Sequence, residues 1–217
     1  MRNGINHQIP VQTSFNLFKY FNINPSFNYQ ERWYFQKVDK EWDPVAKQVI
    51  DSDTTWGFYR LYNYSMSVSA STKVYGTYQF KKGAAIQAIR HMITPSVSFS
   101  YTPDFGKNGY GYYKQVQSDT MGRMMTYSPF ANGLYGVPGS GPGMSLNFSV
   151  SQTLEMKVRD KKDTTGVRKI KLIDNLMISS SYNFLADSLN LSPFSLSLRT
   201  NLFKNVGLNV TATLDPY

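Results

Sequence analysis

The chain has 217 residues, 23 Lys and Arg against 14 Asp and Glu, and no cysteine. Without sulfur ligands it cannot be a disulfide scaffold or a thiolate zinc site. No stretch approaches the roughly 18 consecutive apolar residues of a spanning helix, and the N-terminal segment lacks the apolar core of a signal peptide. The chain is nevertheless rich in aromatic residues (15%) and poor in charge (17%). We expect either a protein that stays inside the cell or a piece of a longer chain.

The first long segment, Phe21 to Phe35, alternates strictly between apolar and polar residues, which is the period of a strand with one apolar face. The same alternation recurs in six later segments, which are Trp56 to Ala70, His91 to Thr102, Met144 to Val158, Leu176 to Phe184, Phe194 to Leu202 and Val206 to Leu214. Several are about twice as long as the five or six residues typical of soluble strands. Helical periodicity of comparable length is absent, so the sequence predicts an all-β fold.

The polar positions of these segments carry Ser, Asn, Thr and Gln, which suit a wet interior better than the outer face of a soluble sandwich. Strands of a transmembrane barrel need about 9 to 11 residues and alternate between lipid and lumen. We therefore predict an open segment of an antiparallel up-and-down transmembrane β-barrel, with residues 1–217 as one partial barrel domain. The side chains predicted to face lipid are Phe27, Tyr29, Tyr62, Tyr64, Met66, Val68, Val97, Phe99, Leu146, Phe148, Val150, Leu196 and Leu198.

The connections fit this topology. Two nearly identical short turns, Asn16 to Lys19 and Asn201 to Lys204, are expected on one rim. The long polar segments Val38 to Thr55 and Pro103 to Gly143 are expected as loops on the other rim, which in such barrels is extracellular. An even number of strands must separate the two short turns. We therefore expect Ser71 to Arg90 to be a single irregular connection, which gives about eight strands.

The segment from Ile89 to Phe105, IRHMITPSVSFSYTPDF, adds a motif to the composition. It resembles the strand opening H-x-x-x-P-x-x-x-x-Y of the Bacteroidota branch of the LptD (OstA-type) lipopolysaccharide-assembly outer-membrane proteins. The similarity continues through Tyr127 to Gly166 and Lys171 to Asn205, over half of the chain, with the loops in the same order.

This resemblance implies a protein of the Gram-negative cell outer membrane that inserts lipopolysaccharide into the outer leaflet. It also implies partners: lipopolysaccharide itself, an LptE-like lipoprotein plug, the periplasmic Lpt bridge components and outer-membrane lipid. The chain lacks a signal peptide, the family's periplasmic jellyroll and an apolar barrel C-terminal signal, since Thr211, Thr213 and Asp215 are polar. We therefore expect an internal fragment. A porin or transporter barrel of another family, or a soluble glycan-binding β-sandwich, remains an alternative.

Residues for catalysis are few. His7 and His91 are far apart, and no nucleophile elbow, zinc-protease motif or phosphate loop is present. We expect no enzyme activity, catalytic residue, metal site or cofactor. The net charge of +9 comes without a nucleic-acid motif, so we expect no nucleic-acid partner. Arg60, among aromatic residues near a long loop, is a candidate outer-rim contact for lipopolysaccharide; the alternative is a local ion pair or cation–π contact with Glu31 or Trp33.

Overall fold

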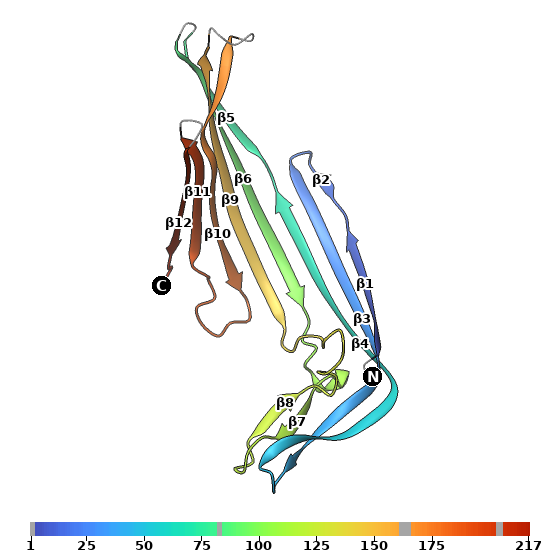
Figure 1. Cartoon of the computed structure of the whole chain (residues 1–217). Helices are drawn as coiled ribbons and strands as arrows, with labels where there is room; N and C mark the ends of the chain where they lie inside the picture. The colour runs from blue at the N-terminus through green and yellow to red at the C-terminus, as the bar shows by residue number, and fades with distance from the viewer. Residues whose placement is uncertain (1–2, 82–83, 161–165, 203–205) are drawn as a thin grey trace. The chain divides into compact units, whose positions relative to one another are not determined.

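The computed structural model describes residues 3–81, 84–160, 166–202 and 206–217 (Figure 1). Regular structure in these ranges is β-strand, apart from one 3₁₀ turn at Asn108–Tyr110. Among the described residues, no helix is long and apolar enough to cross a membrane. The predicted all-β fold is confirmed.

Ten strands form one sheet whose hydrogen-bonded order is β1-β3-β4-β6-β9-β10-β11-β12, with β2 beside β3 and β5 beside β6. The strands are β1 (Gly4–Gln12), β2 (Phe15–Leu17), β3 (Phe21–Asp43), β4 (Gln48–Ser71), β5 (Val74–Gln79), β6 (Ile86–Thr102), β9 (Gly143–Arg159), β10 (Val167–Asn183), β11 (Phe194–Leu202) and β12 (Val206–Leu214). A separate two-stranded sheet pairs β7 (Lys114–Gln117) with β8 (Met124–Tyr127). In the described residues β1 and β12 end the strand order, so the up-and-down sheet is open, as predicted.

The long strands number eight along the main path, as the parity argument requires. The prediction of an irregular connection over Ser71 to Arg90 is wrong, because this segment contains β5. Thr72 donates its backbone N–H to the Pro95 carbonyl (3.2 Å), and Val74 then lies opposite Ile93. β5 therefore continues the line of β4 along β6 after a short break. No chain reversal separates them, so the even count survives.

The prediction of a polar loop over Val38 to Thr55 is also wrong. β3 continues to Asp43 and β4 begins at Gln48, which leaves only a tight turn between them. The Asp43 carboxylate accepts hydrogen bonds from the backbone N–H groups of Val45 (2.8 Å) and Ala46 (3.0 Å), as Asp does in turns. The strands could not be recognised from the period because charged and apolar residues do not alternate in this segment.

The short turn Asn16 to Lys19 closes a hairpin between β2 and β3, as predicted: Leu17 lies opposite Phe21, and the Tyr20 N–H donates to the Leu17 carbonyl (3.2 Å). Its central residues Phe18 and Lys19 have φ of 51° and 66°, the left-handed region that the primed hairpin turns require. The matching turn at Asn201 to Lys204 includes residues 203 and 204, which lie outside the described part of the chain.

The chain divides into two compact units. The first comprises residues 1–12, 26–66 and 101–143, and contains a hydrophobic core of four aromatic residues and one leucine, which are Tyr34, Phe105, Tyr112, Phe130 and Leu61. The second comprises residues 13–25, 67–100 and 144–217 and consists almost entirely of sheet. The predicted loop Pro103 to Gly143 thus supplies much of the first unit's core.

Candidate functional site

The most elaborate structure outside the sheet is residues 103–142, which we call the anchored loop. It connects β6 to β9 and packs on β3 and β4 in the first unit. Phe105 and Tyr112 are almost fully buried, with 1% and 3% of their surface exposed. A loop rich in aromatic side chains can bury them and so hold a fixed conformation, because buried rings contribute strongly to packing.

Tyr112 attaches the loop to the edge of β4. Its hydroxyl accepts a hydrogen bond from the backbone N–H of Tyr62 (2.8 Å) and donates one to the Tyr62 carbonyl (3.1 Å). Buried backbone groups of a strand need a hydrogen-bond partner, and at Tyr62 the Tyr112 hydroxyl supplies it. The Tyr112 hydroxyl thus pairs both backbone groups of Tyr62, as the backbone of a neighbouring strand would. Burial raises the pKa of the Tyr112 hydroxyl, which keeps it protonated and able to donate.

Arg32 and Tyr34 hold the loop on the polar face of β3. Arg32, only 8% exposed, donates to the Tyr135 carbonyl (2.9 Å), to Asn63 Oδ1 (2.6 Å) and to Gln30 Oε1 (2.6 Å). The Tyr34 hydroxyl donates to the Gly136 carbonyl (2.7 Å) and accepts from the Tyr135 N–H (3.1 Å). A buried guanidinium is stable only when its donors are satisfied in this way.

The strand extensions beyond Arg32 add a third attachment. Asp39 pairs with Lys114 of β7 at 2.6 Å. The hydrogen bond from Lys114 lowers the pKa of the Asp39 carboxyl, and the same bond raises the pKa of the Lys114 amine. The Lys40 N–H donates to the Tyr127 hydroxyl (3.0 Å), and the Val38 N–H donates to the Pro129 carbonyl (2.9 Å).

The two ends of the loop are tied together at Asp104. One of its carboxylate oxygens accepts from the N–H groups of Gly106 and Gly141, both at 2.8 Å. Gly106 cannot be replaced without a shift, because an added Cβ would lie 2.8 Å from Ser140 Cβ. Gly141 therefore closes the base of a packed loop through its N–H bond to Asp104.

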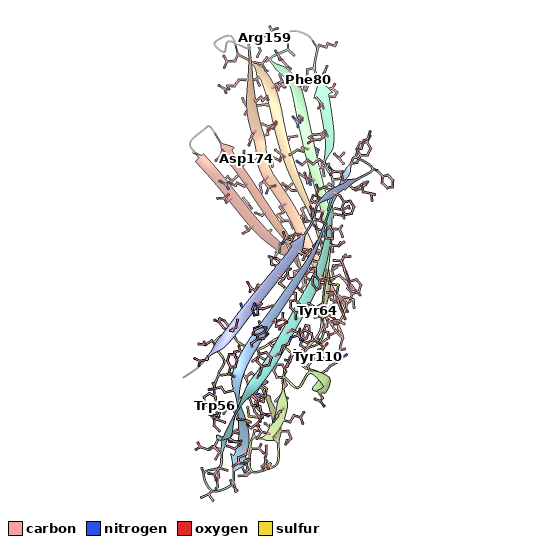
Figure 2. All side chains as sticks on the ribbon, turned by 90° about the vertical axis from the view of Figure 1, so that its right-hand side faces the viewer. Trp56, Tyr64, Phe80, Tyr110, Arg159 and Asp174 are labelled. Carbon is pink, nitrogen blue, oxygen red and sulfur yellow. The ribbon has the colours of Figure 1, made fainter. Side chains whose placement is uncertain are left out.

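On the opposite face of β4 the loop covers two of the predicted lipid-facing residues. Tyr62 contacts the rings of Phe105, Tyr110 and Tyr112, and Tyr64 contacts Phe105 with ring centroids 5.6 Å apart. Figure 2 shows Tyr64 and Tyr110 in the same part of the unit. The loop therefore straddles the edge of β4 and contacts both faces of that strand.

Arg60 lies on the apolar face, as predicted, and it is paired. Its guanidinium donates to both carboxylate oxygens of Glu31 (2.7 and 2.9 Å) and to the Tyr29 hydroxyl (3.0 Å), and it lies 5.3 Å from the centre of the Tyr62 ring. Tyr29 also donates to Glu31. The local ion pair that we weighed as the alternative is therefore present. Contact of Arg60 with lipopolysaccharide remains a prediction.

The other predicted lipid-facing residues share faces as the alternation requires. Phe27 and Tyr29 stand beside Tyr64 and Tyr62 across β3 and β4. In the second unit, the β9–β11 register aligns Val150 with Ile178 and Leu196, and Leu176 with Leu198. Side chains more than a third exposed include Met66 (46%), Val68 (44%), Val97 (45%) and Phe99 (37%), whereas Leu146, Phe148, Val150, Leu196 and Leu198 are half-buried among their neighbours. Lipid contact itself remains a prediction.

The opposite face of the second unit carries rows of hydroxyl groups, which we call the serine face. Ser96 bonds to Ser149 (2.7 Å), and Ser149 lies opposite Ser179, which lies opposite Ser195. A parallel row places Ser100 against Ser145, and a shallow hollow of about 370 Å³ lies along these strands. The serine face is therefore neutral and hydrogen-bonding.

The two histidines are far from forming a catalytic pair. His7 packs its ring on Trp33 (4.6 Å between ring centres) in the first unit, and His91 lies 3.1 Å from Gln152 Oε1 in the second. No group of three or more metal-ligating side chains occurs among the described residues. What the arrangement can do is hold a loop and offer two contrasting faces.

Sequence reasoning missed Arg32, Tyr34, Asp39 and Tyr112 as anchors of the loop. Arg32 carried one available signal, because it is the single charge among the polar positions of the segment Phe21 to Phe35. A lone cation on the polar face predicts a specific acceptor, although the sequence does not say which one.

Comparison with known proteins adds one match. A family model described as LptD protein matches residues 1–217. The comparison with curated proteins gives no match, and the comparison with solved structures gives none either.

Proposed function

The chain belongs to the LptD protein family, and we propose that it forms part of the wall of an outer-membrane barrel that inserts lipopolysaccharide into the outer leaflet. The observation that carries the proposal is the family match over residues 1–217. Family membership is consistent with lipopolysaccharide transport and assembly. The single up-and-down sheet with two contrasting faces agrees with a barrel wall.

The apolar face is proposed to contact membrane lipid. Its exposed side chains include Met66, Val68, Val97 and Phe99. An exposed band of this kind is unfavourable in water and favourable in hydrocarbon. Half-buried members such as Phe148 and Leu198 fill the gaps between neighbouring strands on the same face.

The serine face is proposed to line the passage for the saccharide part of the substrate. Hydroxyl groups exchange hydrogen bonds with water or sugar at little net cost. A neutral row such as Ser96, Ser149, Ser179 and Ser195 therefore offers a saccharide many weak contacts and no strong trap. A passage has to bind its cargo weakly enough to release it.

The anchored loop is proposed to close the extracellular end of this wall. It is expected on the rim opposite the short turns, which is the outer rim of such barrels, and it is held by Arg32, Tyr34, Asp39 and Tyr112. Because each of these polar contacts is individually weak, the loop can be released by breaking them one after another. We propose that it restricts access from outside and moves when substrate passes.

The proposed partners are lipopolysaccharide, an LptE-like lipoprotein, the periplasmic bridge components and outer-membrane lipid, in the outer membrane of a Gram-negative cell of the Bacteroidota type. The role is transport and not bond chemistry. A porin-like role would instead predict uptake of small solutes through the barrel.

The test is controlled depletion of the full-length protein in its own host, followed by labelling of lipopolysaccharide on intact cells. The proposal predicts that surface lipopolysaccharide falls while newly made lipopolysaccharide accumulates in the inner membrane. The level of an unrelated outer-membrane barrel serves as the control for general envelope damage. Unchanged surface lipopolysaccharide together with slower solute uptake would instead favour the porin role.

A further inference from the structure

A hollow of about 640 Å³ in the second unit lies between β5, β6, β9 and β10. Its volume is within the roughly 300–1,000 Å³ of small-molecule sites. It is lined by three cationic side chains, Arg90, Lys157 and Lys169, and one carboxylate, Glu155. We call it the basic pocket. Its polar lining is completed by Thr77, Gln79 and Gln87.

Glu155 is the one carboxylate in the lining of the basic pocket, and in the described part of the chain it forms no ion pair with the three cations. Among the described residues, the ion pairs of this end join Arg168 to Asp160 and Lys171 to Asp174, and none involves Arg90, Lys157 or Lys169. Arg90 instead lies 4.9 Å from the centre of the Tyr75 ring, a cation–π contact that leaves its donors available.

Two of these cations oppose each other in the sheet. Lys157 and Lys169 are direct partners in the β9–β10 register. Like charges at directly opposite positions destabilise an antiparallel pair. A polar or oppositely charged residue at either position would suit the fold better, and an anion bound between the two lysines would offset their repulsion.

The basic pocket lies on the same face of the sheet as the serine face. Arg90 and Ser96 both occupy even positions of β6, and Lys157 and Ser149 both occupy odd positions of β9. It lies near the end of the second unit that carries Phe80 and Arg159 (Figure 2). This end has the short connections between β5 and β6 and between β9 and β10, which in such barrels face the periplasm.

We propose that the basic pocket binds the phosphate groups of a phosphorylated saccharide headgroup as the substrate reaches the serine face. The proposal rests on the proposed function, because lipopolysaccharide carries such a headgroup on its lipid end. The two lysines act as point charges for phosphate and Arg90 as a forked donor. The amide and hydroxyl side chains of Gln79, Gln87 and Thr77 suit the sugar's own hydroxyl groups.

The experiment uses the full-length protein with its native partners in detergent, carrying Lys157→Gln and Lys169→Gln together. Affinity is measured for three probes: the bisphosphorylated glucosamine disaccharide with its acyl chains, the same molecule without phosphates, and phosphatidylglycerol vesicles. A matched control, Lys47→Gln with Lys107→Gln, removes the same charge from exposed lysines of the first unit.

The proposal predicts that the pocket variant binds the phosphorylated disaccharide at least about tenfold more weakly, with wild-type affinity for the dephosphorylated form. Its thermal midpoint should be equal to or above that of the wild type, because a repulsive pair has been removed. The control variant should keep wild-type affinity.

Three results would overturn the proposal: unchanged affinity for the phosphorylated disaccharide, an equal loss with and without phosphates, or a loss seen only with phosphatidylglycerol vesicles. The last result would assign the pocket to a membrane headgroup instead. If the pocket variant binds normally while depletion still removes surface lipopolysaccharide, the pocket assignment fails and the proposed function stands. If depletion leaves surface lipopolysaccharide unchanged, the proposed function fails irrespective of the pocket.

Discussion

Tyr112→Phe is the smallest change that should release the anchored loop. It deletes one buried oxygen that accepts from the Tyr62 N–H at 2.8 Å and donates to the Tyr62 carbonyl at 3.1 Å, and it leaves the ring in place. Each buried backbone group left without a partner costs about 1–3 kcal/mol. We expect local opening of the loop to become easier by roughly 2–6 kcal/mol, since two groups lose their partner.

The assay is amide hydrogen exchange of the full-length protein in lipid nanodiscs. An opening free energy lower by that amount predicts exchange at Tyr62 and in residues 103–142 that is at least about 30-fold and up to about 20,000-fold faster. Tyr110→Phe is the matched control, because its ring belongs to the same cluster and its hydroxyl has no hydrogen-bond partner among the described residues. It should change exchange by little more than a surface substitution does. Equal exchange in the two variants would refute the role assigned to the Tyr112 hydroxyl.

Three further perturbations test other parts of the structure. Lowering the pH should loosen the loop, because Lys114 lowers the pKa of Asp39. The Asp39 carboxylate therefore stabilises the folded loop above the unfolded pKa of about 3.9, and this stabilisation is lost as the pH falls through the lower folded pKa. Proteolysis within the loop should accelerate in acid, and Asp39→Asn should abolish that acid dependence. Gly133→Ala should destabilise the first unit by about 1–3 kcal/mol in denaturant titrations, because the new Cβ would lie 2.6 Å from a neighbouring tyrosine ring; a wild-type midpoint would contradict the packing. If Val97 faces lipid near the midplane, Val97→Arg should destabilise the barrel by about 2–4 kcal/mol and lower the yield of heat-resistant folded barrel in the membrane. Ser98→Arg, on the other face, should be tolerated. Equal yields of the two variants would contradict the assignment of faces.

The strand pattern was readable from the sequence because a two-residue period survives wherever one face is apolar and the other polar. The period failed in the hairpin around Asp43, where charged and apolar residues do not alternate. It also failed at Thr72, where a short break separates β4 from β5. The parity argument remained sound because β4 and β5 run in one direction along β6. The sequence thus predicted which residues share a face of the sheet, and how many strands the sheet has, better than it predicted where each strand ends.

The attachments of the anchored loop could not be predicted in the same way. Tyr112 reaches a backbone 50 residues away in the sequence, and the acceptor of Arg32 in Tyr135 is 103 residues away. Neither partner is distinguished by residue type, since one is a backbone amide and the other a backbone carbonyl. The Arg60–Glu31 pair was foreseeable because both residues lie on neighbouring strands at matching positions.

The most direct test of the account is site-specific photocrosslinking in living cells from two adjacent positions of β10. Ser179 belongs to the serine face, and Ile178 lies opposite Val150 and Leu196 on the apolar face. The account predicts that a photoreactive residue at 179 captures lipopolysaccharide, whereas the same residue at 178 captures mainly phospholipid. Equal capture of lipopolysaccharide at both positions, or capture only at 178, would contradict the claim that the serine face lines its passage.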